Sequence, residues 1–420
     1  MYSLFLPKTW PFPIKLLPQN AYLVGGSVRD QLLQRQPSYL DLDFVLSHKA
    51  VETAWNLSQK CNAGFVVLDE ARQIARVVFD RATVDFAQQQ GDSLEADLRR
   101  RDFTINAIAY HPLSQTLVDP LGGKDDIATQ TLRMVSPENL AADPLRLMRA
   151  YRQAAQLGFT IEERTQQTIG DLAPKLQQVA IERVSSELDG LLSVPAGTAK
   201  LEAILQQRLL QFCLPHFTAQ SIRQIEAIDG AIAQLKNLLP DYADSLEAWL
   251  EPVAAGFHRS WIKATKLSRL LARESAIAQV ELSNLAYSRT EAQVVLTLLK
   301  AQPALNRMQA GTLSRSAQFF LFKLAAKNFP AISLLALSQG IAFSRVEPMI
   351  AKFLDPADPV AHPQKLITGH EIMQQLGMKP GPQLGALIKS VEKAQAIGEI
   401  STKTQAVSWL LQQPSTIQSN

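Results

Sequence analysis

The hydrophobic pattern divides this chain into a first part that alternates strand-like and helix-like runs and a longer remainder with helical spacing. Up to about residue 121, short runs rich in β-branched and aromatic residues are bounded by turn residues, which indicates strands. The predicted strands are 22–24, 40–46, 65–69, 74–79, 83–86, 108–110 and 116–118. Helices are predicted over 28–34 and 50–61. The first part is therefore expected to form an α/β unit around a small sheet.

The pattern changes from residue 143 onward. Apolar residues recur three or four positions apart, as at Val184, Leu188 and Leu191, and strand signals almost vanish. Breaks between helices are predicted near 193–197, around 239–241 and in the Pro-rich segment 355–363. We therefore expect an α+β chain in which a small mixed sheet is followed by an all-helical array.

Composition indicates a globular protein with ample core. The 420 residues predict two to four structural units, and 46% of them are hydrophobic against 19% charged. No apolar stretch is expected to span a membrane, and residues 1–10 lack the features of a signal peptide. Cys61 and Cys213 form no metal or redox motif and are expected to be reduced thiols in a cytoplasmic protein. The six histidines lack metal-ligand spacing, which argues against a zinc enzyme.

The net charge of +3 is unevenly distributed. Residues 1–150 carry 16 Lys and Arg against 17 Asp and Glu, whereas the rest of the chain carries 26 against 22. This excess permits a polyanionic partner for the helical part without requiring one. Basic positions such as Arg259, Lys263, Lys266 and Arg269 could contact such a partner or form an ordinary solvated face.

Two carboxylates, Asp41 and Asp43, stand one residue apart on a predicted strand. A strand alternates its faces with period two, so both point the same way while Leu42 points into the core. Like charges on one face repel each other unless a cation lies between or beside them. Mg²⁺ takes oxygen ligands and leaves room for phosphate oxygens, so the pair predicts a magnesium site. A solvated Asp-x-Asp strand is the alternative.

A Gly-Gly turn precedes this pair and leads from the first strand into a short helix. Gly25, Gly26, Ser27 and Arg29 are predicted to contact phosphate, because glycine lets a backbone approach a phosphate closely and arginine donates to its oxygens. A simple tight turn is the alternative. The closeness of this turn to the acidic pair favours a site that holds a nucleoside triphosphate on Mg²⁺.

The segment 97–107 combines three consecutive arginines with nearby acidic and amide side chains. Arg101 and Asn106 suit a triphosphate and a ribose, and Asp102 could accept a hydrogen bond from a ribose 2′-hydroxyl. A solvated basic helix end is the alternative. The next Gly-Gly turn, within 119–127, is interpreted mainly as a structural link between sheet and helices.

A fourth cluster begins at Asp143, which is followed by proline and could cap a helix. Asp143 and Arg146 are three residues apart, hence neighbours on one helical face, and offer an acceptor beside a forked donor. Cytosine and adenine present an amino donor beside a ring-nitrogen acceptor, whereas uracil and guanine invert that pattern. The pair could therefore admit C and A, while Arg149 and Arg152 could reach phosphates.

These clusters, in this order, resemble those of the class II tRNA nucleotidyltransferase and bacterial poly(A) polymerase family. The matching stretches are 25–30 with 41–43, 100–107, 119–123, 143–146 and 181–184, and a tail-like segment follows at 367–381. The resemblance implies a polymerase-beta type nucleotidyltransferase head over 1–125 and a helical neck with the base-recognition motif over 126–195. It further implies a helical body over 196–290 and a tRNA-binding tail over 291–420.

The resemblance also implies residue roles and a reaction. Asp41 and Asp43 would be catalytic and hold Mg²⁺, Gly26 and Arg29 would contact the triphosphate, and Arg101 and Asp102 would contact ribose or phosphate. The residue pair at 143 and 146 would select C or A. A tRNA 3′-hydroxyl would attack the α-phosphate of CTP or ATP and release pyrophosphate.

The chain departs from the family pattern at two places. Ala142 stands where the base-recognition motif usually has glutamate, and only seven residues, 87–93, follow the strand at 83–86 before Leu94. Relatives that complete C-C-A carry a longer flexible loop there, so we expect addition of C-C only. A full CCA-adding enzyme, a poly(A) polymerase and a non-catalytic RNA-binding module are the alternatives. The non-basic ending 412–420 favours tRNA over general RNA, and Asp85 could be a third carboxylate near the metal or a solvated strand-end residue.

Overall fold

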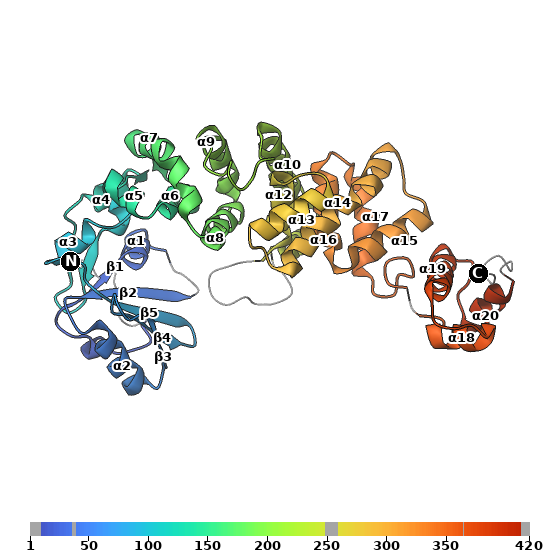
Figure 1. Ribbon diagram of the computed structural model, residues 1–420, viewed down its shortest axis with the longest axis horizontal. Coiled ribbons are helices and arrows are strands. Elements are labelled where there is room, and N and C mark those ends of the chain that lie inside the picture. The colour runs from blue at the N-terminus through green and yellow to red at the C-terminus, as the bar shows by residue number, and fades with distance from the viewer. Residues whose placement is uncertain (1–9, 36–38, 248–258, 364, 413–420) are drawn as a thin grey trace. The chain divides into compact units, whose positions relative to one another are not determined.

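The computed structural model describes residues 10–35, 39–247, 259–363 and 365–412, and the chain splits into two compact units, Met1–Leu209 and Leu210–Asn420. The predictions about the two chain ends fall largely on residues 1–9 and 413–420, which lie outside the described residues. The first unit holds a sheet and a group of helices, and the second unit is helical in its described residues (Figure 1). The expected division into head, neck, body and tail stays a prediction.

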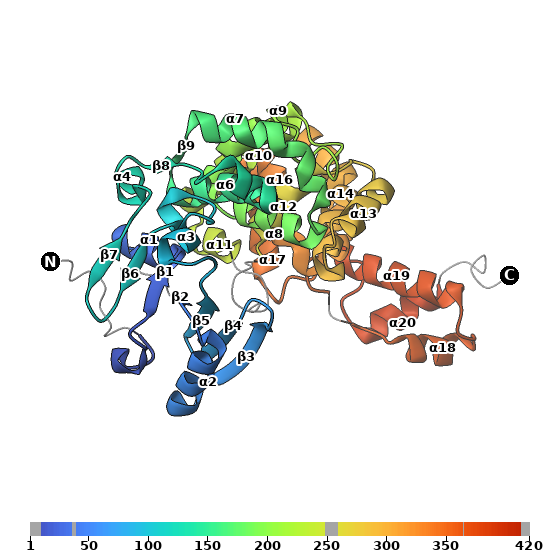
Figure 2. The same ribbon diagram turned by 60° about the vertical axis from the view of Figure 1, so that its left-hand side comes forward.

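The first unit is built on a seven-stranded sheet of order β3-β4-β5-β2-β1-β6-β7 (Figure 2). The strands are β1 (Ala21–Val24), β2 (Leu40–Leu46), β3 (Gly64–Asp69), β4 (Ile74–Phe79), β5 (Ala82–Gln88), β6 (Ala109–His111) and β7 (Thr116–Val118). Only the pairing of β2 with β5 is parallel in this sheet, so the sheet is mixed as expected. Each predicted strand is present, with its ends displaced by at most two residues.

Helix α2 (Ala50–Cys61) packs against β4 and β5 and closes one face of the sheet. The alternation of β2 is confirmed, because Leu42 and Phe44 are only 3% and 1% exposed within this core. The Phe44 ring stacks on Phe86 of β5 with a centroid distance of 5.3 Å. The odd-numbered residues of β2 therefore face the opposite side of the sheet.

Besides α2, the first unit has helices between its strands and after them. They are α1 (Gly26–Leu32), α3 (Leu94–Leu98), α4 (Gly123–Ala128), α5 (Pro137–Ala142), α6 (Leu145–Leu157), α7 (Glu163–Leu172), α8 (Ile181–Leu192) and α9 (Leu201–Gln206). Helix α6 packs on α8, and a two-stranded parallel sheet of β8 (Thr131–Leu132) and β9 (Thr160–Ile161) contacts α4 through β8 and α6 through β9. The hydrophobic pattern did not predict β8 and β9, because two residues show no alternation.

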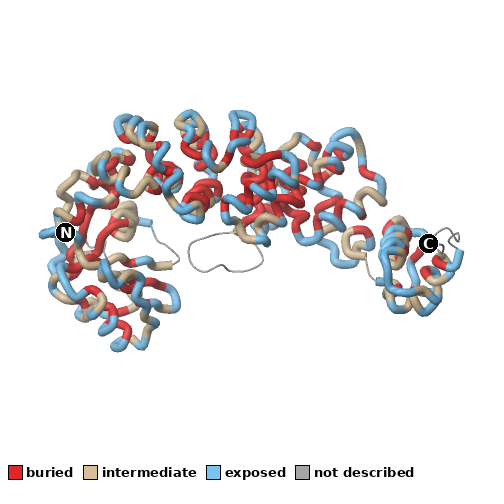
Figure 3. The backbone as a smooth tube through the Cα atoms, viewed as in Figure 1, coloured by how far each residue is buried: buried red, intermediate tan, exposed pale blue. Residues whose placement is uncertain are grey.

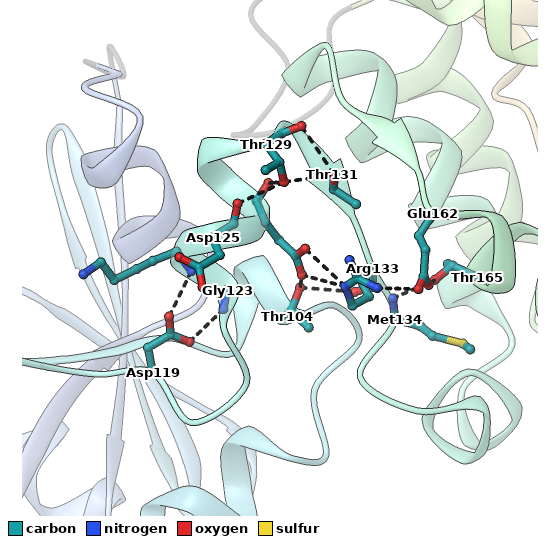
Figure 4. A network of polar contacts seen from close by, with 12 residues as sticks. Thr104, Asp119, Gly123, Asp125, Thr129, Thr131, Arg133, Met134, Glu162 and Thr165 are labelled. Carbon is teal, nitrogen blue, oxygen red and sulfur yellow. Dashed lines mark hydrogen bonds and ion pairs between the residues drawn. The ribbon is translucent and has the colours of Figure 1, made fainter.

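A polar network joins the sheet segment to these helices (Figure 4). Thr104 Oγ1 donates to Asp126 Oδ2 at 2.6 Å, and Arg133 pairs with both Asp126 and Glu162. Thr165 Oγ1 donates to Glu162 Oε2 at 2.7 Å. Through these contacts Asp126 of α4 is linked to Thr104, which precedes β6, and through Arg133 to Glu162 at the start of α7.

The second Gly-Gly turn is structural, as the sequence indicated. Asp119 carboxylate oxygens accept the backbone N–H groups of Gly123 at 2.8 Å and Lys124 at 2.9 Å (Figure 4). Asp119 thereby satisfies backbone donors at the start of α4 that the helix itself leaves unpaired.

The second unit packs helices around a large apolar core. They are α10 (Ala219–Leu238), α11 (Pro240–Ser245), α12 (Trp261–Leu270), α13 (Ser275–Asn284), α14 (Arg289–Ala310), α15 (Arg315–Ala325), α16 (Phe329–Ser338), α17 (Phe343–Leu354), α18 (Gly369–Leu376), α19 (Pro382–Ile397) and α20 (Lys403–Leu411). The predicted break at 355–363 falls between α17 and α18, whereas the break at 193–197 runs into a 3₁₀ helix that begins at Pro195, and that at 239–241 leaves only Leu239 between α10 and α11. Helix α16 is buried almost throughout (Figure 3), whereas α18, α19 and α20 enclose a smaller core of their own.

Two findings in this unit bear on what the sequence predicted. The stretch Arg315–Ser338 is long and apolar enough to cross a membrane by composition, but 72% of its most apolar window is buried inside the protein, as in a core helix. Helix α12 is not a solvated basic face either. Lys263 and Lys266 are 2% and 1% exposed in their side chains and pair with Glu291 at 3.1 Å and Asp229 at 2.6 Å.

Replacing Gly123 by alanine should destabilise the first unit, because the added Cβ would lie 2.3 Å from the carbonyl oxygen of Thr104. Backbone cannot yield as a flexible side chain can, so we expect a loss of about 1–3 kcal/mol in unfolding free energy, as for other overpacked sites. Denaturant unfolding measures it. Gly170→Ala is the matched control, since its Cβ would meet only ordinary contacts at 3.7 Å. Equal stability of the two variants would contradict the prediction.

Candidate active site

Three carboxylates from adjacent strands share one face of the sheet. The parallel register sets Asp41 of β2 beside Thr83 of β5, and Asp43 beside Asp85. Thr83 Oγ1 donates to Asp41 Oδ1 at 2.6 Å. Arg76 of β4 binds both oxygens of Asp85, through Nε at 2.7 Å and Nη2 at 2.8 Å. Asp85 is therefore a third carboxylate near the pair, and the solvated-residue alternative is wrong.

Asp43 is the least compensated of the three. Burial, and then the charges of Asp41 and Asp85, raise the pKa of Asp43 to about 7, against the opposing pull of Arg101 and Arg149. No hydrogen bond from a described residue reaches its carboxylate. An electron-rich, poorly compensated carboxylate pair is what a divalent cation would neutralise, so the residues present fit a metal ion.

The donor set also indicates which kind of cation fits. Across the described residues, no group of three or more His, Cys, Asp and Glu side chains converges as a metal site. Two neighbouring carboxylate side chains without a further protein ligand among the described residues suit a hard cation that takes its other ligands from substrate and water. Soft or fully protein-enclosed metal sites do not fit this arrangement.

The turn between β1 and α1 brings backbone against this acidic face. Gly25 has φ +73°, a conformation that L side chains rarely adopt, and an added Cβ would lie 3.2 Å from Arg101 Nη1 and 3.6 Å from Asp43 Oδ2. Ser27 Oγ donates to the Asp41 carbonyl oxygen at 2.6 Å, which fixes the start of α1 to β2. The helix begins at Gly26, two residues before the predicted start, because Gly25 itself completes the turn.

A chain of hydrogen bonds connects α1 to α6 through Asn106. Arg29 Nη1 donates to Asn106 Oδ1 at 2.7 Å, and Asn106 Nδ2 donates to Asp102 Oδ1 at 2.9 Å and to Gln153 Oε1 at 3.0 Å. Arg149 Nε lies 3.1 Å from Asp102 Oδ2. Four residues predicted from three separate motifs thus form one network, and Asn106 is its centre.

Asp102 is buried, and both of its oxygens are already engaged. Burial alone would raise the pKa of its carboxyl, but Arg149 and the hydrogen bond from Asn106 outweigh that effect and lower it. The backbone N–H of Phe103 adds a further bond to Oδ1 at 2.8 Å. This carboxylate holds Arg149 and Asn106 in place.

Arg101 keeps unused donor capacity beside the acidic face. Its Nη2 lies 3.3 Å from Asp97 Oδ2, whereas its buried Nε has no hydrogen-bond partner among the described residues. Such an orphaned buried donor is costly unless a ligand uses it.

The predicted capping role of Asp143 is wrong. Asp143 ends α5, Pro144 precedes the first residue of α6, and no side chain caps that helix. The Asp143 carboxylate instead lies 3.3 Å from Arg183 Nη2 of α8. Pro144 disfavours a helical conformation at the residue before it, so Asp143 stays extended at φ −133° and outside α6. The Asp143 carboxylate therefore accepts no capping hydrogen bond from the backbone of α6.

The arginines of α6 have different surroundings. Arg146 Nη1 donates to the carbonyl oxygens of Arg100 at 3.0 Å and Asn139 at 3.1 Å, so it is not paired with Asp143. Arg152 Nε donates to Glu187 of α8 at 2.5 Å, which makes it a link between α6 and α8.

Five residues of the site were not predicted from the sequence. They are Arg76, Thr83, Gln153, Arg183 and Glu187. Gln153 alone carried a signal, since it stands four residues after Arg149 on one helical face.

Three family models match this chain. Residues 21–133 match the "Poly A polymerase head domain", residues 158–221 match the "Probable RNA and SrmB- binding site of polymerase A", and residues 260–410 match domain 2 of tRNA nucleotidyltransferases. The predicted site residues up to Asn106 all lie in the first of these segments.

Curated relatives span nearly the whole chain. It is 43% identical over 401 residues to the CC-adding tRNA nucleotidyltransferase of Synechocystis sp., with 95% of each chain covered. It is 33% identical to the CC-adding tRNA nucleotidyltransferase of Geobacter sulfurreducens, with 93% of this chain and 91% of the relative covered. It is 31% identical to the A-adding tRNA nucleotidyltransferase of Deinococcus radiodurans, with 94% and 95% covered.

Solved structures agree in fold. A CCA-adding enzyme in complex with ATP superposes with a TM-score of 0.70 at 20% identity, covering 93% of this chain and 90% of that chain. The Thermotoga maritima CCA-adding enzyme complexed with tRNA gives a TM-score of 0.65 at 20% identity, with the same coverage. The predicted α+β fold, a sheet-containing head followed by helices, is confirmed.

Asn106→Ala should destabilise the first unit and weaken nucleotide binding. The substitution removes the acceptor of Arg29 and a donor to Asp102, and leaving such buried groups unpaired costs about 1–3 kcal/mol. We expect that loss in unfolding free energy, together with a higher KM for nucleotide because Arg29 is no longer held. Asn20→Ala, which removes only an exposed bond to Ser47, is the control. An unchanged KM in the Asn106 variant would show that Asn106 does not order the nucleotide site.

Proposed function

This chain belongs to the tRNA nucleotidyltransferase and poly(A) polymerase family, and we propose that it adds two cytidines to the 3′ end of tRNA with release of pyrophosphate. One observation carries the proposal: the carboxylate pair Asp41 and Asp43 stands on the face of the sheet opposite the core of Leu42 and Phe44, beside the Gly25 turn and the unpartnered donor of Arg101. That is a site for a metal-bound triphosphate. Transfer to tRNA follows from the family.

In the proposed reaction, the tRNA 3′-oxygen bonds to the α-phosphorus of CTP while the bond from that phosphorus to the bridging oxygen of pyrophosphate breaks. Asp41 and Asp43 would hold Mg²⁺, which would supply charge neutralisation on the triphosphate and lower the pKa of the attacking hydroxyl. Arg101 and Arg29 would donate to phosphate oxygens. Gly25, Gly26 and Ser27 would let the backbone approach the triphosphate.

Base choice is proposed to rest on Asp143 and Arg146. An acceptor beside a donor matches the Watson–Crick edges of C and A and leaves U and G with unpaired polar groups. Arg183 holds one Asp143 oxygen, which orients the carboxylate while its other oxygen can still accept from an exocyclic amino group. Arg149 is proposed to contact ribose or phosphate, and Asp102 to position Arg149 rather than touch the nucleotide. Arg152 would need to leave Glu187 to reach a phosphate.

The limit of two cytidines is supported by the short connection after β5. Gln89 N donates to the Leu46 carbonyl at 2.7 Å, Gln90 N donates to Asp97 Oδ1 at 2.8 Å, and Ser93 caps α3. A connection fastened at both ends has little freedom to reshape a pocket for a second base. The two CC-adding relatives at 43% and 33% identity point the same way.

A second candidate, terminal A addition, is favoured by one observation, the 31% identity to an A-adding relative. CTP and a tRNA that lacks its 3′ end are the proposed substrates, with ATP the alternative nucleotide. We also propose that the protein is cytoplasmic. Its two cysteines, Cys61 and Cys213, are free thiols in the structure.

Asp43→Ala should abolish nucleotide transfer while leaving tRNA binding intact. Removing a metal ligand takes away several kcal/mol of charge stabilisation, so incorporation of labelled CTP should fall at least about a hundredfold. The tRNA Kd should stay within about twofold, since Asp43 would serve the metal and the nucleotide and not the acceptor arm. The charge-matched control is Asp80→Ala, an exposed residue between β4 and β5. Chelation of divalent cations should stop the wild type, and Mg²⁺ should restore it. Transfer by the Asp43 variant at the wild-type rate would refute the assignment.

A product assay separates the candidate specificities. With tRNA lacking its last three nucleotides, CTP and ATP, we expect products that are longer by two cytidines and then stop, read by sequencing of the 3′ ends. With tRNA that already ends in C-C, ATP should give no extension. Efficient extension of that substrate would exclude C-C addition as the full activity and favour a CCA-adding or A-adding enzyme.

A further inference from the structure

A cavity in the second unit has arginines in its wall that lack acidic partners among the described residues. It measures about 360 Å³ and lies where the end of α12 meets the first turns of α10 and α13. Its wall includes His216, Gln220, Ser268, Arg269, Arg273 and Glu274. This is a different place from the acidic face of the sheet, which belongs to the first unit.

Arg269 is a half-buried cation of this wall without an acidic partner among the described residues. Its Nε donates to Ser268 Oγ at 3.0 Å, but neither terminal nitrogen has a hydrogen-bond partner, and no carboxylate forms an ion pair with it, in the part of the chain that the structure describes. Burial, and then the charge of Arg273, lower the pKa of the Arg269 guanidinium to about 10. Its neighbours Lys263 and Lys266 on the same helix are both neutralised by acids, so Arg269 differs from them.

The surrounding groups add donors rather than acceptors. Gln220 turns its side-chain oxygen to Arg223 Nη2 at 2.7 Å, which leaves its amide nitrogen as a donor. Helix α13, ten residues long, has no side-chain cap, so backbone N–H groups of its first turn remain available to an anion.

The acids nearby do not cancel this charge. Glu281 accepts from the backbone N–H of Ala272 at 2.7 Å and lies 2.6 Å from His216 Nδ1, so both of its carboxylate oxygens already have partners other than the two arginines. Glu274 is exposed at the start of α13 and pairs with neither arginine in the described structure. Two arginines thus face one free carboxylate.

We propose that this cavity binds a backbone phosphate of the tRNA substrate, with Arg269 and Arg273 as its charged donors. Guanidinium groups match the tetrahedral oxygens of a phosphodiester, and double-stranded RNA offers proteins its phosphates and 2′-hydroxyls more readily than its base edges. Part of the wall, 216–221, falls in the segment that matches an RNA-binding family model. The inference rests on the proposed function only in taking tRNA as the substrate.

The test compares the tRNA affinity of Arg269→Gln and Arg273→Gln with that of the wild type across salt concentrations. Removing a charged donor to phosphate should weaken binding about tenfold and lower the slope of log Kd against log salt by about one. Arg269→Lys should recover part of the affinity, since it keeps the charge without the fork. Arg273 is exposed, so its variant should fold even if the Arg269 variants are damaged.

The control is Lys236→Gln, which removes an exposed lysine charge paired with Glu247, roughly 24 Å from Gln220 along α10 at 1.5 Å per residue. It should leave affinity and slope unchanged. Wild-type values in folded Arg269 and Arg273 variants, or weaker binding with an unchanged slope, would overturn the proposal. So would protection of the wild type by inorganic phosphate alone with no change of tRNA affinity in the variants. Failure of C addition by the wild type, with tRNA binding still dependent on Arg269, would instead count against the proposed function.

Discussion

The parallel pairing of β2 with β5 is the constraint on which the candidate site depends. It sets Asp41 and Asp43 beside Thr83 and Asp85 on one face, while Leu42 and Phe44 anchor the same strand in the core. A slip by one residue would bury the carboxylates and expose the apolar side chains, which is why the apolar face fixes the position of the acidic one. Site and fold are therefore specified by the same strand.

The second constraint is the way the acidic face is surrounded. Arg76 forms an ion pair with Asp85, and Thr83 donates a hydrogen bond to Asp41. The negative charge of Asp43 has no such partner, so a bound cation would neutralise it. Around it, Asn106 joins residues from α1, the segment before β6 and α6 into one hydrogen-bonded network. Preorganised donors of this kind act without reorganisation at the moment of reaction, which is where nucleotidyl transfer would gain most of its rate.

Much of the first unit could be predicted from sequence, because its strands alternate clearly and its motifs sit at strand ends. All seven strands of the large sheet and the faces of Asp41 and Asp43 were predicted, whereas the two-residue strands β8 and β9 were not. What sequence could not supply were partners distant along the chain. One example is Arg183, which pairs with Asp143. Asp143 binds this arginine and does not cap a helix because α6 packs on α8, which carries Arg183. Periodicity likewise shows that α12 has an apolar face but not that its lysines are buried with acids from α10 and α14.

Those buried lysines change what the formal charge of the helical half means for long-range attraction. Lys263 and Lys266 each carry an acid at contact distance, so a distant polyanion experiences two compact dipoles rather than two cations. The field that draws RNA toward this unit from solution is accordingly generated by fewer side chains than the amino-acid composition implies. Because the formal net charge already subtracts the two acids, the pairing leaves that net charge unchanged and alters only its distribution, so cations without an acid beside them, such as Arg269 and Arg273, set the direction from which a polyanion approaches this unit.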